Sequence, residues 1–247
     1  TMLAGIRSAE PTAPSTAARL VVLAGTQDAE GNTLAGVQRE LHGLERYGAV
    51  QARGAAAVEI WSAADILHIA AHASVSDDAP WRSRILLDGL EGAAADTLDA
   101  AGIAGTPLAA RLAVLASCET AGGRILSGEG VQGLGSAFLA AGVPAVLATL
   151  RPVDDQATAR FCEFFYAALA DGKAPTAALA QARSRLADDA LWSDPYYWAG
   201  FVLLGDGTRP VSLSQRKRPT VWAFGCVFAV VGGLAWWRHR RNSGAPS

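Results

Sequence analysis

A short apolar run that ends in a thiol constrains this chain more than any other feature. Residues 112–116 are Leu-Ala-Val-Leu-Ala, and Ser117 and Cys118 follow directly. An apolar run of this length predicts a strand that is buried on both faces, which is typical of the central strands of a parallel sheet. Ligands of open parallel sheets bind beyond the carboxyl ends of the strands. Cys118 is therefore expected at the edge of the sheet where a site forms.

A second run has the same design and ends in a histidine. Residues 66–71 are Ile-Leu-His-Ile-Ala-Ala, and His72 follows them. A thiol becomes an effective nucleophile when a nearby base favours its thiolate, and a histidine can then protonate the leaving amine. We expect the two strand ends to lie side by side, with His72 and Cys118 as a base and a nucleophile. Their spacing of 46 positions agrees with the caspase spacing of about 50.

Strand and helix patterns alternate along the chain, which predicts an α/β fold with a mostly parallel, six-stranded sheet. Asn32 or Thr33 is expected to cap the first helix, and Gly48 to end it. A short strand is expected at 85–87. The other strand patterns lie at 20–24, 49–53, 66–72, 112–116, 143–150 and 198–204. Helices are expected at about 34–47, 55–64, 131–141, 155–170 and 175–189, with part of 90–110.

Charge and cysteine content exclude several classes of protein. The net charge of −2 does not indicate a nucleic-acid-binding protein. The three cysteines, Cys118, Cys162 and Cys226, are odd in number and far apart, which suits a reducing compartment and no disulfide framework. Cys162 and Cys226 are expected to have no special role.

No metal or cofactor site is expected from the sequence motifs. His68 and His72 share one face of the predicted strand, but the zinc motif His-Glu-x-x-His is absent because residue 69 is isoleucine. His68 is therefore interpreted as a buried structural residue. Gly128–Gly133 matches Gly-x-Gly-x-x-Gly, but it lies about ten residues after the preceding strand, too far for the tight turn of a dinucleotide site.

The C-terminal region differs from the rest of the chain. Residues 221–237 are 17 uncharged residues with tryptophan at both ends, flanked on both sides by basic residues. This pattern predicts a transmembrane helix over 220–237 and a membrane-anchored protein whose main domain is cytoplasmic. The alternative is a hydrophobic helix buried in the globular domain. The predicted organisation is 1–17 linker or end of an upstream region, 18–208 folded domain, 209–219 basic linker, 220–237 membrane helix and 238–247 basic tail.

Six sequence blocks, in order, resemble the CHAT domain family, which belongs to the clan of caspases, separases and gingipains. The blocks are residues 66–72, 115–121, 128–134, 138–144, 153–155 and 195–201. The resemblance implies a three-layer caspase–haemoglobinase fold and an endopeptidase that cleaves a protein. It also implies regulation by a partner or by an upstream helical-repeat region.

The resemblance implies roles for particular residues. His72 is the base and Cys118 the nucleophile, and the backbone N–H groups of Cys118 and Ala73 form the oxyanion hole. The family usually has glycine where this chain has Ala73. Because alanine resists positive φ, this departure favours the alternative of a catalytically inactive interaction or scaffold module. A flavodoxin-like ligand-binding domain also fits the strand pattern, but it leaves the six blocks unexplained.

Acidic residues near the predicted site have two interpretations. Asp154 and Asp155 follow the strand at 143–150 and can cap the next helix. Alternatively, they form a specificity pocket that prefers Arg or Lys before the cleaved bond, as an aspartate does in basic-specific peptidases of the clan. Glu119 can also line this cleft.

Overall fold

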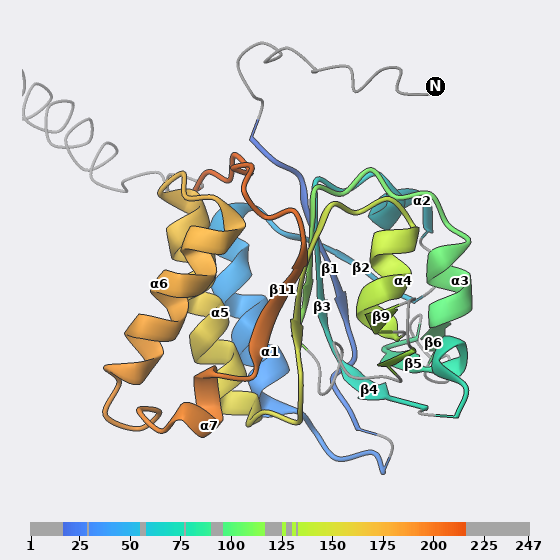
Figure 1. Cartoon of the computed structure of the whole chain (residues 1–247), viewed down its shortest axis with the longest axis horizontal. Coiled ribbons are helices and arrows are strands. Elements are labelled where there is room, and N and C mark those ends of the chain that lie inside the picture. The colour runs from blue at the N-terminus through green and yellow to red at the C-terminus, as the bar shows by residue number, and fades with distance from the viewer. Residues whose placement is uncertain are drawn as a thin grey trace, which may run out of the picture. The chain divides into compact units, whose positions relative to one another are not determined.

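A mostly parallel sheet of six strands forms the middle layer of the domain (Figure 1). The structure, a computed structural model, describes residues 17–28, 30–54, 58–76, 78–89, 96–116 and 133–215, and the backbone of 125–126 and 130–131. The strand order is β11-β10-β7-β3-β1-β2, and only the β10–β11 pair is antiparallel. The strands are β1 (Leu20–Ala24), β2 (Val50–Ala52), β3 (Ile66–Ala70), β7 (Leu112–Leu115), β10 (Ala145–Thr149) and β11 (Phe201–Gly205). The predicted α/β fold and six-stranded sheet are confirmed.

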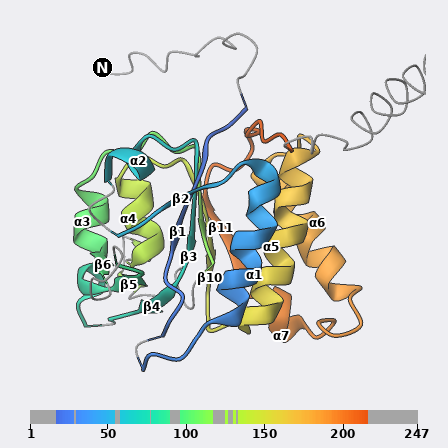
Figure 2. The same cartoon turned by 180° about the vertical axis from the view of Figure 1, so that it is seen from behind.

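Helices cover both faces of the sheet, as Figures 1 and 2 show from opposite sides. One face carries α1 (Ala35–Leu44), α5 (Asp155–Ala170), α6 (Pro175–Ala187) and α7 (Pro195–Trp198). The other carries α2 (Val58–Ser62), α3 (Ala100–Ala104) and α4 (Leu134–Ala140). Short 3₁₀ turns, η1 (Glu45–Tyr47) and η3 (Pro80–Arg82), lie between these elements.

The core is divided by the sheet because successive side chains of a strand point to opposite faces. Leu20, Val22 and Ile66 pack with Phe161 and Phe165 of α5 on one side. The intervening positions of the same strands pack against α4 on the other: Val21, Leu23, Leu67, Ile69, Leu134 and Phe138. Both faces of β1, β3, β7 and β10 are buried, which explains why the sequences of these four strands are almost entirely apolar.

The predicted strand 66–72 is wrong at its end. β3 stops at Ala70, and His72 begins β4 (His72–Ser74), which pairs antiparallel with β5 (Arg84–Leu87) in a separate three-stranded sheet completed by β6 (Asp96–Asp99). The short strand expected at 85–87 therefore lies in this small sheet. β8 (Ile125–Leu126) and β9 (Gly130–Val131) form another pair.

The start of α1 also differs from the prediction. Neither Asn32 nor Thr33 is the N-cap residue: Leu34 occupies that position and offers no side-chain hydrogen bond. The carboxylate of Asp155, at the start of α5, instead accepts a hydrogen bond from the backbone N–H of Gly36. Gly48 ends the following turn as predicted, in the left-handed conformation with φ 72°.

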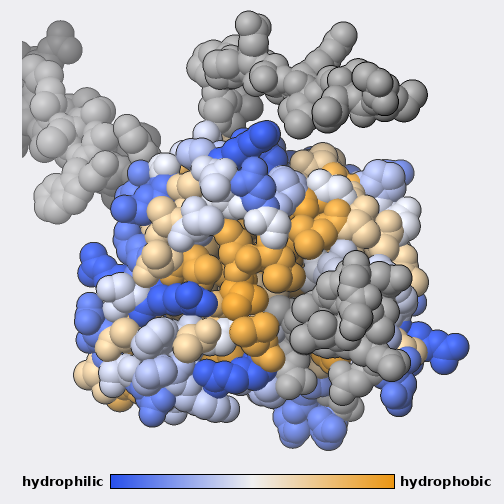
Figure 3. Space-filling model, in the orientation of Figure 1, coloured by the Kyte–Doolittle hydropathy of each residue, from blue (hydrophilic) through white to orange (hydrophobic). Residues whose placement is uncertain are grey.

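Strand β11 lies at one edge of the main sheet. Its residues Val202, Leu203 and Leu204 are half-buried. Figure 3 shows hydrophobic side chains gathered in the centre of the surface, over this strand. The final strand begins at Phe201 rather than at Trp198, because residues 195–198 form α7.

The predicted localisation, a chain anchored in a membrane by a C-terminal helix, is corrected. Among the described residues, no helix is long and apolar enough to cross a membrane. The longest of these helices, α5, has 16 residues. At 1.5 Å per residue it spans about 24 Å, less than a hydrocarbon core of about 30 Å. The predicted segment 220–237 lies outside the described residues.

Replacing Gly36 by alanine is expected to destabilise the domain. A methyl group at Gly36 would overlap the backbone oxygen and the carboxylate of Asp155. Overpacking of this kind costs about 2 kcal/mol. The matched control is Gly43→Ala on the same helix, where an added methyl meets nothing within 4 Å and alanine gains up to about 1 kcal/mol of helix propensity. Urea denaturation of both variants measures the difference, and equal effects would contradict the close contact between α1 and α5.

Candidate functional site

The register of β3 and β7 relates the two predicted catalytic positions. Ile69 is paired with Leu115, a separation of 46 residues, and Ala116 N–H extends the pairing by donating to Ile69 O at 2.8 Å. His72 and Cys118 are separated by the same 46 residues. His72 therefore comes three positions after Ile69, and Cys118 comes three positions after Leu115, the partner of Ile69. Cys118 and Glu119 themselves lie outside the described residues.

His72 is held in place by the small sheet at the carboxyl end of the main sheet. It is half-buried and is paired with Leu86 of β5. The end of β5 is tied to the end of β1, because the Asp88 carboxylate accepts hydrogen bonds from Thr26 N at 2.8 Å and Thr26 Oγ1 at 2.9 Å. Gly25 allows this approach, since a side chain there would overlap the Leu86 carbonyl.

Ala73 lies within β4, buried and paired with Ile85. A strand has an extended backbone that alanine adopts without strain. The replacement of the family's usual glycine by Ala73 therefore imposes no left-handed conformation at this position. Its part in an oxyanion hole stays a prediction, because the second donor, Cys118, is not among the described residues.

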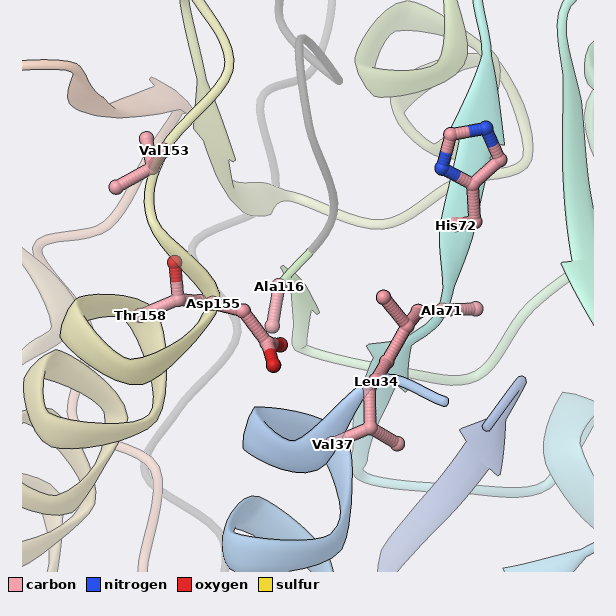
Figure 4. Close-up of a pocket in the computed structure, with 8 residues that line it drawn as sticks. All are labelled: Leu34, Val37, Ala71, His72, Ala116, Val153, Asp155 and Thr158. Carbon is pink, nitrogen blue, oxygen red and sulfur yellow. The ribbon is translucent and has the colours of Figure 1, made fainter. Parts of the chain in front are cut away.

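A pocket at this edge of the sheet brings together side chains from four parts of the chain (Figure 4). It is lined by Leu34 and Val37 at α1, Ala71 and His72 after β3, Ala116 after β7, and Val153, Asp155 and Thr158 at the start of α5. Ala116 is the last described residue before Cys118. His72, Asp155 and the end of β7 thus border one pocket.

Asp154 and Asp155 have different surroundings although they are adjacent. Asp154 is the N-cap of α5, and its carboxylate accepts a hydrogen bond from Ala157 N at 2.9 Å. This agrees with the capping interpretation. The carboxylate of Asp155 caps α1 through Gly36 N and lines the pocket with His72. Of these two aspartates, Asp155 is the one that lines the pocket formed by the described residues.

Asp28 is a residue near His72 that the sequence reasoning missed. The pKa of Asp28 is lowered, chiefly because the side chain and backbone N–H of Asn32 donate to its carboxylate, both at 2.8 Å. His72 makes a smaller electrostatic contribution to this lowering. The only signal in the sequence is position: Asp28 follows β1, whose carboxyl end lies at the same edge of the sheet.

The fold and the pocket define a three-layer α/β domain with a histidine at the carboxyl edge of a parallel sheet. The CHAT domain model matches residues 3–206, and the chain belongs to this family. Tetratricopeptide repeat protein 28 of mouse is 36% identical over 136 residues, and the human protein 35%. These matches cover 55% of this chain but only 5% of each relative.

Two solved structures are similar to this chain at low sequence identity. The separase–securin complex of Saccharomyces cerevisiae matches with a TM-score of 0.49 and 12% identity, over 77% of this chain and 12% of that one. The Arg-specific cysteine proteinase gingipain R matches with a TM-score of 0.48 and 10% identity, over 78% of this chain and 47% of that one.

Replacing the cap residue Asp154 by alanine is expected to cost stability. The change removes the hydrogen bond to Ala157 N, and loss of an N-cap side chain costs about 1 kcal/mol. The control is Asp171→Ala at the other end of α5, where removing a negative charge costs nothing because the helix dipole disfavours it. Thermal unfolding compares the two variants, and an unchanged melting temperature for Asp154→Ala would contradict the capping role.

Proposed function

We propose that this chain is a cysteine endopeptidase domain in which His72 is the base and Cys118 the nucleophile. The observation that carries the proposal is the register of β3 and β7. Ile69 is paired with Leu115, and His72 and Cys118 each come three positions after one of these two residues. Membership of the CHAT family supports it. So does the pocket that His72 shares with the end of β7.

The proposed reaction has two steps through a thioester. His72 takes the Cys118 proton as the sulfur attacks the carbonyl carbon of the peptide bond. The C–N bond then breaks, and His72 passes the proton to the leaving amine. Water next attacks the thioester with His72 as base, the C–S bond breaks, and the proton returns to sulfur. Backbone N–H groups of Ala73 and Cys118 donate to the oxyanion in both steps.

Asp155 is the group we propose for substrate selection. Its carboxylate lines the same pocket as His72, whereas the Asp154 carboxylate caps α5. An acidic group at this place favours a basic side chain, Arg or Lys, before the cleaved bond. Glu119 stays a further candidate for the cleft.

We further propose that the substrate is a protein and that a partner or an upstream helical-repeat region controls access to it. The supporting observation is that the curated relatives carry tetratricopeptide repeats in their name, and this chain matches about 5% of their length. A catalytically inactive scaffold module is the competing function, and labelling of Cys118 separates the two.

The dyad is tested with a peptidyl probe that carries a thiol-reactive group. Cys118 is expected to be labelled in the native chain, and His72→Ala is expected to slow labelling by about 10³-fold, because the thiolate is then no longer favoured. His42→Ala is the control, since His42 is an exposed histidine on α1. Cys162 serves as an internal control, because burial raises the pKa of its thiol well above the usual value.

Peptide mapping by mass spectrometry identifies the labelled thiol. Labelling of Cys118 that is unaffected by His72→Ala would refute the dyad. Absence of labelling at Cys118, also in the presence of the upstream region, would favour the scaffold module.

Substrate selection is tested with reporter peptides that differ only in the residue before the cleaved bond. Asp155→Asn is expected to lower kcat/KM for an Arg reporter by about 30-fold or more, equivalent to about 2 kcal/mol for a lost charge pair, and to leave a Leu reporter unchanged. Asp154→Asn is the matched control and is expected to keep the preference. Equal cleavage of Arg and Leu reporters by the unaltered chain would refute the role of Asp155.

A further inference from the structure

Three ligand-type side chains meet in the interior between α1, α5 and the sheet. They are the carboxylate of Glu40 on α1, the imidazole of His68 on β3 and the thiol of Cys162 on α5, and their ligand atoms all lie within 4.8 Å of one another. The exposed fractions of these residues are 3%, 0% and 3%. This cluster is distinct from the pocket of His72, because His68 points to the face of the sheet that α1 and α5 cover.

Two buried polar atoms of the cluster have no hydrogen bond among the described atoms. Nε2 of His68 lies 2.9 Å from Oε2 of Glu40. Among the described atoms, however, neither has a hydrogen bond of acceptable geometry. A buried polar atom without a hydrogen bond costs about 1–3 kcal/mol. A cation that binds both atoms would take the place of the missing hydrogen bonds.

Tyr166 orients the His68 side chain so that it can bind a cation. Nδ1 of His68 lies 3.0 Å from the hydroxyl of Tyr166, on the same helix as Cys162. When Nδ1 carries the proton and donates it to this oxygen, Nε2 presents its lone pair to the cluster. Metal-binding histidines are oriented by this kind of partner on their other nitrogen.

The charges of the cluster favour a divalent cation. Burial disfavours an uncompensated negative charge on the Glu40 carboxylate or the Cys162 thiolate. A divalent cation bound to a Glu40 carboxylate and a Cys162 thiolate would leave a neutral buried site, with two negative ligands and one neutral imidazole. A set of one S, one N and one O ligand suits Zn²⁺.

We propose that Glu40, His68 and Cys162 form a zinc site that joins α1 and α5 to the central sheet. Two ligand atoms of a tetrahedral zinc ion, each about 2.0 Å from the metal, lie about 3.3 Å apart. The distance of 2.9 Å between His68 Nε2 and Glu40 Oε2 would therefore increase only slightly on zinc binding. A fourth ligand, water, can enter from the pocket between α1 and α5, which Glu40, Cys162 and Tyr166 line.

The site is tested by titrating the metal-free full chain with Zn²⁺ and with Co²⁺ as a spectroscopic probe. The Cys118→Ala background is used so that the proposed nucleophile contributes no thiolate. One equivalent of metal is expected, with a rise in melting temperature and a near-ultraviolet charge-transfer band from thiolate to cobalt. Cys162→Ser and His68→Gln are each expected to weaken Zn²⁺ binding by about 100-fold or more and, for Cys162→Ser, to abolish the band.

Matched controls lie on the same helices. Glu163→Gln and His42→Gln alter a carboxylate and an imidazole outside the cluster, and both are expected to bind zinc like the background chain. X-ray absorption of the zinc-loaded background chain needs no change in the cluster and is expected to show one sulfur ligand at about 2.3 Å. Absence of stoichiometric binding, a zinc ion without a sulfur ligand, or binding unchanged in a folded Cys162→Ser variant would overturn the proposal.

Discussion

The pairing of β3 with β7 is the constraint on which the rest of the site depends. Both strands lie inside the sheet and are buried on both faces. A slip of one residue in such a pair would turn every side chain to the opposite face, so the apolar packing on each side maintains the register. The register in turn places the residues that follow both strands at one edge of the sheet. His72 and Ala116, two residues before Cys118, lie there.

The helix α1 connects this edge with the interior of the domain. Its first turn is capped by Asp155, which also lines the pocket, and about one turn further on it carries Glu40 into the buried cluster. The negative charge of Asp155 contributes to the raised pKa of Glu40, although burial is the larger cause.

The predictions that failed concern the ends of elements and the partners of side chains. Residues 66–72 look like one strand because they are apolar apart from two histidines, yet the chain leaves the main sheet after Ala70 to pair with β5. Asn32 and Thr33 are good capping residues, but the cap of α1 comes from Asp155, 119 residues away from Gly36. Local pattern cannot reveal either outcome, because each depends on an element distant in sequence.

The sequence by itself determined the α/β class, the main strands and helices and the family, because continuous apolar runs and ordered motif blocks are local properties of the chain. It also predicted that His72, Asp154 and Asp155 lie at one edge of the sheet. Only the tertiary structure decided that Asp154 caps a helix while its neighbour Asp155 faces the pocket. The meeting of Glu40, His68 and Cys162 was likewise invisible in sequence, since three separate elements must pack before these side chains lie within 4.8 Å of one another.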